Sequence, residues 1–114
     1  MILITGGNGQ GKHAFAETLL SEKTESRIVS QYHLYLRRRM QEGAGEETLL
    51  QETKDFCKEH PNAIVVTEEV GCGVVPMDSF ERTWREVCGR ASVILADRSE
   101  QVYRLICGIP QRLK

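Results

Sequence analysis

The feature that most constrains the fold of this sequence is a glycine-rich segment between a short apolar run and an amphipathic stretch. Residues 2–4 are wholly apolar, and the apolar residues after Lys12 recur at helical spacing. The segment fits the pattern GxxxxGK and consists of Gly6, Gly7, Asn8, Gly9, Gln10, Gly11 and Lys12. A strand, small residues and a helix in this order predict a phosphate cradle built from backbone N–H groups, a helix N-terminus and a lysine. A glycine-rich turn with a chance lysine is the competing interpretation.

The residue after the lysine departs from the usual form of this motif. That place is normally taken by Ser or Thr, whose hydroxyl holds Mg²⁺, and here it is His13. Imidazole is a poor ligand for Mg²⁺, which prefers oxygen. The sequence therefore predicts nucleotide binding more strongly than metal-assisted transfer, and His13 would contact a phosphate oxygen or cap the loop.

The rest of the chain alternates apolar runs with stretches of helical periodicity. We expect strands at 2–4, 28–29, 63–67 and 102–107, and helices at 12–21, 31–42, 46–59 and along an apolar face from Met77 to Ile94. Asp78 and Glu81 predict a capping box, and residues 108–110 are expected to turn the chain toward its end. This alternation predicts an α/β fold of the P-loop NTPase type, with three layers and a mainly parallel sheet. Ligands of such sheets bind at the carboxyl ends of the strands.

Composition narrows the classes of protein further. The 114 residues fit a single domain, 1–114, and the net charge of -1 predicts no bulk attraction to nucleic acid or to a membrane. No apolar run approaches the ~20 residues that cross a bilayer. The basic run 37–39 predicts a solvated helix face, with a phosphate-contacting patch as the second interpretation.

Cysteine usage and the start of the chain indicate a reducing compartment. Cys57, Cys72, Cys88 and Cys107 show no CxxC spacing, which argues against a zinc site or a redox pair, and we expect them to be buried as small hydrophobes. Met1 leads directly into an apolar strand without a basic leader. We therefore expect a cytoplasmic protein.

Charged residues near the expected strand ends are candidates for chemistry. Glu68 and Glu69 end the run at 63–67, where an acid commonly holds a metal or takes a proton from a substrate hydroxyl. Glu69 is the preferred candidate for both roles, and Glu68 is equally well explained as a solvent-facing strand end. Arg82 and Arg85 lie one helical turn apart and would bind a substrate phosphate, with a solvated helix face as the alternative.

Both ends of the chain resemble the bifunctional adenosylcobinamide kinase / adenosylcobinamide-phosphate guanylyltransferase family of cobalamin biosynthesis. Residues 1–7, 11–12 and 15–17 are similar to the opening strand, loop and helix of that family. The EVGCGVVP segment at 69–76 resembles its NEVGxGIVP motif, 80–86 and 89–90 resemble the following helix, and 96–97 and 102–114 resemble the closing strand and turn. The preference for Glu69 rests on its place in this motif.

The resemblance implies a P-loop kinase-like domain that phosphorylates the aminopropanol hydroxyl of adenosylcobinamide with ATP or GTP. It also implies transfer of GMP through a guanylylated histidine, and a homo-oligomer. Family chains carry that histidine in a long segment between the first helix and the next apolar strand. Here only a short polar stretch separates Leu20 from Ile28, so guanylyl transfer is not expected. His33 does not match that histidine and is interpreted as an ordinary helix residue.

Several polar positions of the family are altered in this chain. Ser30 stands where the family has an aspartate, Glu68 replaces its Asn, and Ser92–Val93 replaces its Asn-Gln, in addition to His13. Three functions therefore stay open. The first is a shortened corrinoid kinase, and the second is a non-catalytic nucleotide-binding module with a degenerate metal site. The third is a P-loop NTPase with another acceptor.

Overall fold

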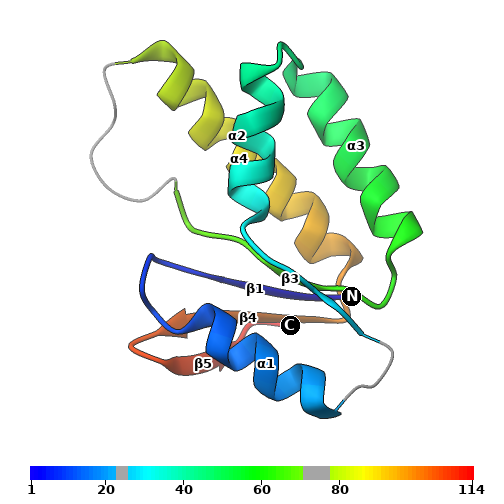
Figure 1. Cartoon of the computed structure of the whole chain (residues 1–114), viewed down its shortest axis with the longest axis vertical. Coiled ribbons are helices and arrows are strands. Elements are labelled where there is room, and N and C mark those ends of the chain that lie inside the picture. The colour runs from blue at the N-terminus through cyan, green and yellow to red at the C-terminus, as the bar shows by residue number, and fades with distance from the viewer. Residues whose placement is uncertain (23–25, 71–77) are drawn as a thin grey trace.

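The computed structural model describes residues 1–22, 26–70 and 78–114, which form one α/β sheet structure (Figure 1). The elements of these residues are β1 (Ile2–Gly6), α1 (Lys12–Glu22), β2 (Ile28–Val29), α2 (Tyr32–Gln41), α3 (Glu46–Glu59), β3 (Ile64–Val66), α4 (Ser79–Arg98), β4 (Gln101–Ile106) and β5 (Ile109–Arg112). The strand order is β2-β3-β1-β4-β5, and all neighbours are parallel except β4 and β5. The predicted α/β fold with a mainly parallel sheet is confirmed.

The sheet is covered on both faces, with α1 on one side and α2, α3 and α4 on the other (Figure 1). Side chains alternate along β1, because successive residues of a strand point to opposite faces. Ile2 and Ile4 pack with Ala16 of α1, whereas Leu3 packs in the cluster that includes Leu36 of α2. A central strand buried on both faces explains why residues 2–4 are wholly apolar.

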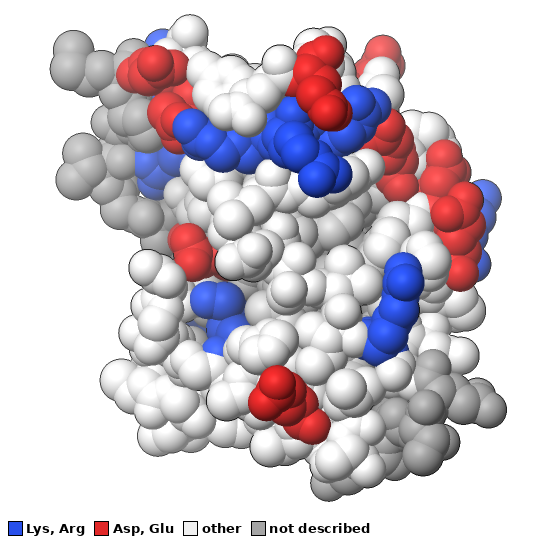
Figure 2. All heavy atoms as spheres, viewed as in Figure 1, with Lys and Arg blue, Asp and Glu red and all other residues white. Residues whose placement is uncertain are grey.

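Two arginines of the basic run link α2 to its neighbouring helices. Arg37 donates to the Glu81 carboxylate of α4, at 2.8 Å for the Nη1–Oε2 pair. Arg39 donates to Glu52 of α3, with Nη2 and Oε1 2.7 Å apart. Figure 2 accordingly shows blue and red side chains next to one another over the helical layer. The solvated face predicted for this run therefore also holds the helices together.

The end of the chain differs from the sequence prediction. Residues 108–110 were expected only to turn the chain, but Ile109–Arg112 form β5, which pairs antiparallel with β4. Cys107 and Gly108 have φ values of 53° and 75°, the left-handed geometry of a two-residue hairpin turn. The turn also leaves Cys107 exposed, contrary to expectation, whereas Cys57 and Cys88 are buried as predicted.

The start of α4 has the Asp78 half of the predicted capping box, while the Glu81 carboxylate accepts hydrogen bonds from Arg37. Asp78 is the N-cap residue, and its carboxylate accepts hydrogen bonds from the backbone N–H groups of Phe80 and Glu81. The predictions for Met77, Cys72 and the rest of 71–76 lie outside the described residues. No helix in the described part of the chain is both long and apolar enough to cross a bilayer.

Candidate functional site

The predicted phosphate loop connects the end of β1 to the start of α1. Gly6 has a φ of 148°, and a Cβ at this residue would lie 2.7 Å from the carbonyl oxygen of Leu105 in β4. Gly9 and Gly11 also have positive φ values, of 72° and 90°. Glycine is therefore required where the loop leaves the sheet, and the loop bends in a way that residues with side chains rarely adopt.

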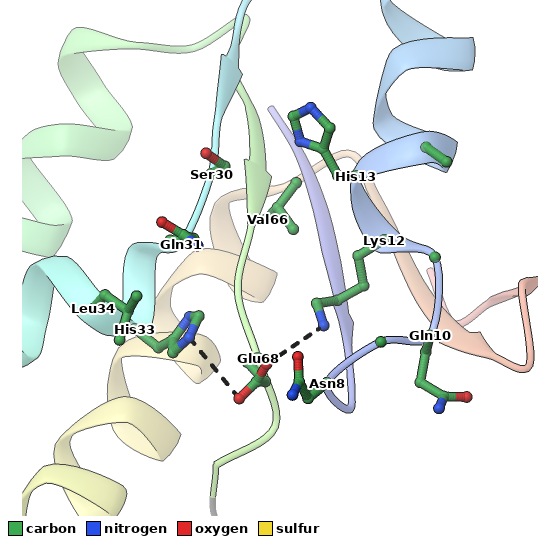
Figure 3. A pocket seen from close by; sticks show the side chains of 13 residues that line it. Asn8, Gln10, Lys12, His13, Ser30, Gln31, His33, Leu34, Val66 and Glu68 are labelled. Atoms are coloured by element: carbon green, nitrogen blue, oxygen red, sulfur yellow. Dashed lines mark ion pairs between the residues drawn. The ribbon is translucent and has the colours of Figure 1, made fainter.

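Lys12 lies across its own loop. Its Nζ donates a hydrogen bond of 2.6 Å to the carbonyl oxygen of Gly7 and lies 3.8 Å from Oε1 of Glu68 (Figure 3). The side chain is 11% exposed, so this charge sits at the mouth of the loop rather than in open water. An anion that entered the loop would therefore contact the Lys12 ammonium group.

A cavity of about 710 Å³ opens beside this loop, between the start of α1, the end of β3 and the start of α2. These segments meet because the carboxyl ends of parallel strands lie at one edge of the sheet. The lining residues are Asn8, Gly9, Gln10, Gly11, Lys12, His13, Ala14, Ser30, Gln31, His33, Leu34, Val66 and Glu68 (Figure 3). The structure thus brings together most of the predicted cradle. Gly7 lines a neighbouring cavity of about 620 Å³ with Glu69 and Arg104.

The hairpin between β4 and β5 is hydrogen-bonded to the loop. The Gln10 side-chain oxygen accepts a hydrogen bond of 2.6 Å from the backbone N–H of Cys107. The backbone N–H of Gly108 donates to the carbonyl oxygen of Gln10 at 3.0 Å. A residue of the predicted cradle is therefore held by the β4–β5 hairpin, whose strand pairing the sequence did not predict.

The two adjacent acids have different environments. Glu69, the preferred candidate, accepts hydrogen bonds from Arg104 of β4, at 2.7 Å for Nε–Oε1 and 3.0 Å for Nη2–Oε2. Its backbone N–H donates to the carbonyl oxygen of Gly6 at 3.0 Å. Glu68 instead extends into the 710 Å³ cavity toward Lys12. The acid that lies beside the phosphate-loop lysine is therefore Glu68.

His33 is a site residue that the sequence did not single out. It is 7% exposed, and its Nε2 lies 4.0 Å from Oε2 of Glu68 (Figure 3). Its Nδ1 is buried and has no hydrogen-bond partner among the described residues. Burial lowers the pKa of this imidazole, and the Glu68 carboxylate opposes that effect. The sequence signal was its position at the start of a helix that follows a short strand.

The other predicted site residues lie at the margin of the cavity or outside it. His13 lines the cavity, but its side chain is 60% exposed and its Nε2 lies 3.2 Å from Oε1 of Glu17, one helical turn away. Arg82 is exposed and Arg85 partly buried on α4, and neither is among the residues that line the 710 Å³ cavity.

The side chains around Lys12 supply fewer Mg²⁺ ligands than the usual form of this motif does. Mg²⁺ takes oxygen ligands in near-octahedral geometry, yet His13 replaces the usual hydroxyl and both carboxylate oxygens of Glu69 accept bonds from Arg104. No group of three or more His, Cys, Asp or Glu side chains that would hold a metal occurs in 1–22, 26–70 and 78–114. Glu69 as a metal ligand therefore stays a prediction.

The sheet order and the glycine-rich loop between β1 and α1 define an α/β protein with a fold of the P-loop NTPase type. The family described as cobinamide kinase / cobinamide phosphate guanyltransferase matches residues 31–113, so the chain belongs to this family, and the resemblance seen in the sequence is confirmed. The chain is also similar to two bifunctional adenosylcobalamin biosynthesis proteins CobU, from Salmonella typhimurium strain LT2 and Escherichia coli strain K12. Each is 36% identical over 59 residues, which are 51% of this chain and 33% of the relative.

The loop at residues 6–12 precedes the range that the family matches. The prediction that residues 6–12 bind phosphate therefore rests on the geometry of the loop and not on the family match. The alignments with the two relatives span a third of their length, so whole activities do not carry over to this chain directly.

Proposed function

We propose that this chain, as a single domain over residues 1–114, binds ATP or GTP and transfers the γ-phosphoryl group to the hydroxyl of a corrinoid of the cobinamide class. The observation that carries the proposal is the glycine-dependent loop, with Lys12 at its mouth and a 710 Å³ cavity beside it. Family membership supplies the acceptor class. The cavity volume is within the range of small-molecule sites.

Each residue has a defined part in this proposal. Backbone N–H groups of residues 7–13 hold the phosphates, and Lys12 moves its Nζ from Gly7 and Glu68 to the outer phosphates. Glu68 takes the proton that the acceptor hydroxyl loses. Glu69 supports the site through Arg104, which links the segment after β3 to β4. Binding of a substrate phosphate by Arg82 and Arg85, a homo-oligomer and a cytoplasmic location stay predictions.

A second candidate function is a nucleotide-binding module without turnover. The observation that favours it is His13, which occupies the place of the metal-binding hydroxyl and pairs with Glu17. Such a module would keep the cradle and respond to nucleotide without transferring a phosphoryl group.

Substitution Lys12→Ala tests the cradle. A charge-assisted hydrogen bond contributes about 1.5–3 kcal/mol, so the affinity for ATP or GTP should fall roughly 10- to 100-fold. The matched control is Lys58→Ala, which removes an exposed lysine from the last turn of α3. Isothermal titration with and without Mg²⁺ measures the affinity, and thermal unfolding checks the fold. Equal affinity in wild type and Lys12→Ala would show that the cradle assignment is wrong.

Turnover separates the two candidate functions. Wild-type protein is incubated with ATP or GTP and cobinamide, and both the nucleoside diphosphate and the phosphorylated corrinoid are quantified by chromatography. A kinase forms the two products in equal amounts and only when cobinamide is present. A binding module retains nucleotide affinity, lost in Lys12→Ala, but forms neither product.

A further inference from the structure

The wall of the cavity opposite the cradle carries two polar groups with a gap between them. Nε2 of His33 and Oε2 of Glu68 lie 4.0 Å apart, which is longer than a hydrogen bond. Both residues line the cavity, one from the start of α2 and the other from the end of β3 (Figure 3). A single oxygen atom about 2.8 Å from each of them would close this gap with two ordinary hydrogen bonds.

The fold holds His33 in this place, although neither ring nitrogen is at hydrogen-bond distance from a partner among the described residues. The His33 backbone is fixed, because its carbonyl oxygen accepts a hydrogen bond of 2.8 Å from Nε1 of Trp84 in α4. The ring is nine-tenths buried, and its Nδ1 has no partner among the described residues. A buried polar group without a partner costs free energy. The other ring nitrogen, Nε2, faces the Glu68 carboxylate across the gap, which favours the neutral tautomer with its proton on Nε2. The ring therefore offers an Nε2–H donor to a ligand in the gap.

The charges around the gap select the kind of ligand. The Glu68 carboxylate repels an anion, and Lys12, 3.8 Å from Glu68, repels a cation. The neighbouring wall contains the aliphatic side chains of Leu34 and Val66. A neutral hydroxyl group on a largely uncharged carrier meets all of these conditions, because it accepts one hydrogen bond and donates another.

We propose that His33 and Glu68 together form the subsite for the acceptor hydroxyl, opposite the phosphate loop. The subsite rests on the proposed function and adds His33 to it as a substrate-binding residue. The neutral His33 ring donates from Nε2–H to the hydroxyl oxygen, and the hydroxyl donates to Oε2 of Glu68. This arrangement orients the hydroxyl oxygen toward a phosphoryl group held by Lys12.

The transfer step requires these side chains, the acceptor hydroxyl and a nucleoside triphosphate. A bond forms between the acceptor oxygen and the γ-phosphorus. The bond from the γ-phosphorus to the bridging oxygen breaks, and its electron pair leaves with the nucleoside diphosphate. The hydroxyl proton moves to Glu68, while His33 keeps its proton and acts in binding and orientation.

The test is a comparison of His33→Ala with wild type in two binding measurements. Cobinamide binding is followed by equilibrium dialysis, read from its visible absorbance, in the presence of a non-hydrolysable ATP analogue. Binding of the analogue itself is measured by titration. We expect His33→Ala to weaken cobinamide at least tenfold and to change analogue affinity less than twofold. His33→Gln, whose amide N–H replaces the Nε2–H, should recover part of the loss.

Controls make the result specific to the subsite. His60→Gln changes a histidine that packs against Phe56, outside the 710 Å³ cavity, and should leave both affinities unchanged. If His33→Ala fails to fold, as judged by its unfolding curve, the comparison is made with His33→Gln and His33→Asn. Cobinamide affinity within twofold of wild type in the folded His33 variants would overturn the subsite.

The outcomes also separate this inference from the proposed kinase activity. His33-dependent cobinamide binding without product formation supports the subsite and contradicts the kinase activity. Product formation with a cobinamide KM that is unaffected in His33→Ala supports the kinase and overturns the subsite. Absence of cobinamide binding by wild type overturns the subsite, whatever the nucleotide affinity.

Discussion

The two walls of the 710 Å³ cavity differ in how completely the fold satisfies them. On the cradle wall, contacts are at hydrogen-bond distance: Lys12 to Gly7 at 2.6 Å, Cys107 to Gln10 at 2.6 Å and Gly108 to Gln10 at 3.0 Å. On the opposite wall, Glu68 lies 3.8 Å from Lys12 and 4.0 Å from His33. The cradle wall is held by short hydrogen bonds, whereas the Glu68 carboxylate on the opposite wall is separated from its neighbours by longer gaps.

Under the proposed function, this difference explains how the two walls of one cavity would bind two different reactants. The triphosphate group is the same in every nucleoside triphosphate. A preorganised loop would bind it with little loss of conformational entropy in the backbone amides. The acceptor must be selected among many hydroxyl compounds. Polar groups that lack hydrogen-bond partners in the folded protein favour a ligand that supplies those partners. Changes in the cradle wall should therefore affect folding and nucleotide affinity, and changes in the opposite wall should affect acceptor binding and pH dependence.

The largest effect that would break the cradle wall is expected for Gly6→Ala. The added Cβ would lie 2.7 Å from the Leu105 carbonyl oxygen, at a φ of 148° that residues other than glycine rarely adopt. We expect the free energy of unfolding to fall by on the order of 3 kcal/mol, because backbone strain and overpacking add together. Urea unfolding followed by circular dichroism measures the loss.

Gly89→Ala is the matched control for that experiment. Gly89 lies inside α4, and nothing is within 4 Å of the position that its Cβ would take. Alanine should raise the free energy of unfolding by about 0.5–1 kcal/mol, because glycine is a poor helix former. If Gly6→Ala were as stable as wild type, the close approach of the loop to β4 would be wrong.

A smaller effect on the same wall is expected for Gln10→Ala. This change removes the side-chain hydrogen bond to the Cys107 N–H but leaves the backbone bond from Gly108. Nucleotide affinity should fall about three- to tenfold, which corresponds to about 1 kcal/mol for one neutral hydrogen bond. Titration with ATP or GTP measures it. Gln51→Ala, which removes an exposed contact within α3, should have no effect, and an equal loss in both variants would contradict the bracing role of the hairpin.

The cradle wall was predictable from the sequence because its determinants are local. The positions of Gly6, Gly11 and Lys12 relative to one strand and one helix are fixed by a few covalent bonds. The alternation of apolar runs predicted the sheet in the same way, since each buried strand needs consecutive apolar residues. The hairpin brace was missed because Ile109 and Pro110 lack alternation, and because the contact of Cys107 with Gln10 spans 97 positions in the chain.

The opposite wall was only partly predictable because it depends on how separate strands are arranged. Glu68 and Glu69 are adjacent in the sequence, and one residue of register decides which of them extends toward Lys12. The structure directs Glu69 to Arg104 of β4 and Glu68 to the cavity. His33 reaches the same cavity because β2 lies next to β3 in the sheet. Neither fact is encoded in a short motif, so the family pattern favoured Glu69 and passed over His33.

The smallest predicted effect is the contribution of His33 to the pH dependence of the free energy of unfolding. Burial lowers the pKa of His33 below its ordinary value of 6.5, so the unfolded chain binds a proton more readily than the folded chain does. The free energy of unfolding should therefore fall as the pH drops below about 6.5, toward the lower pKa of the folded state. His33→Gln removes this contribution, and its unfolding free energy should depend less on pH than that of wild type. Urea unfolding at pH 7.5, 6.5 and 5.5 measures the slope, with His60→Gln and Gln10→Ala as controls that retain it. An unchanged slope in His33→Gln would show that His33 is not the group that makes this wall sensitive to pH.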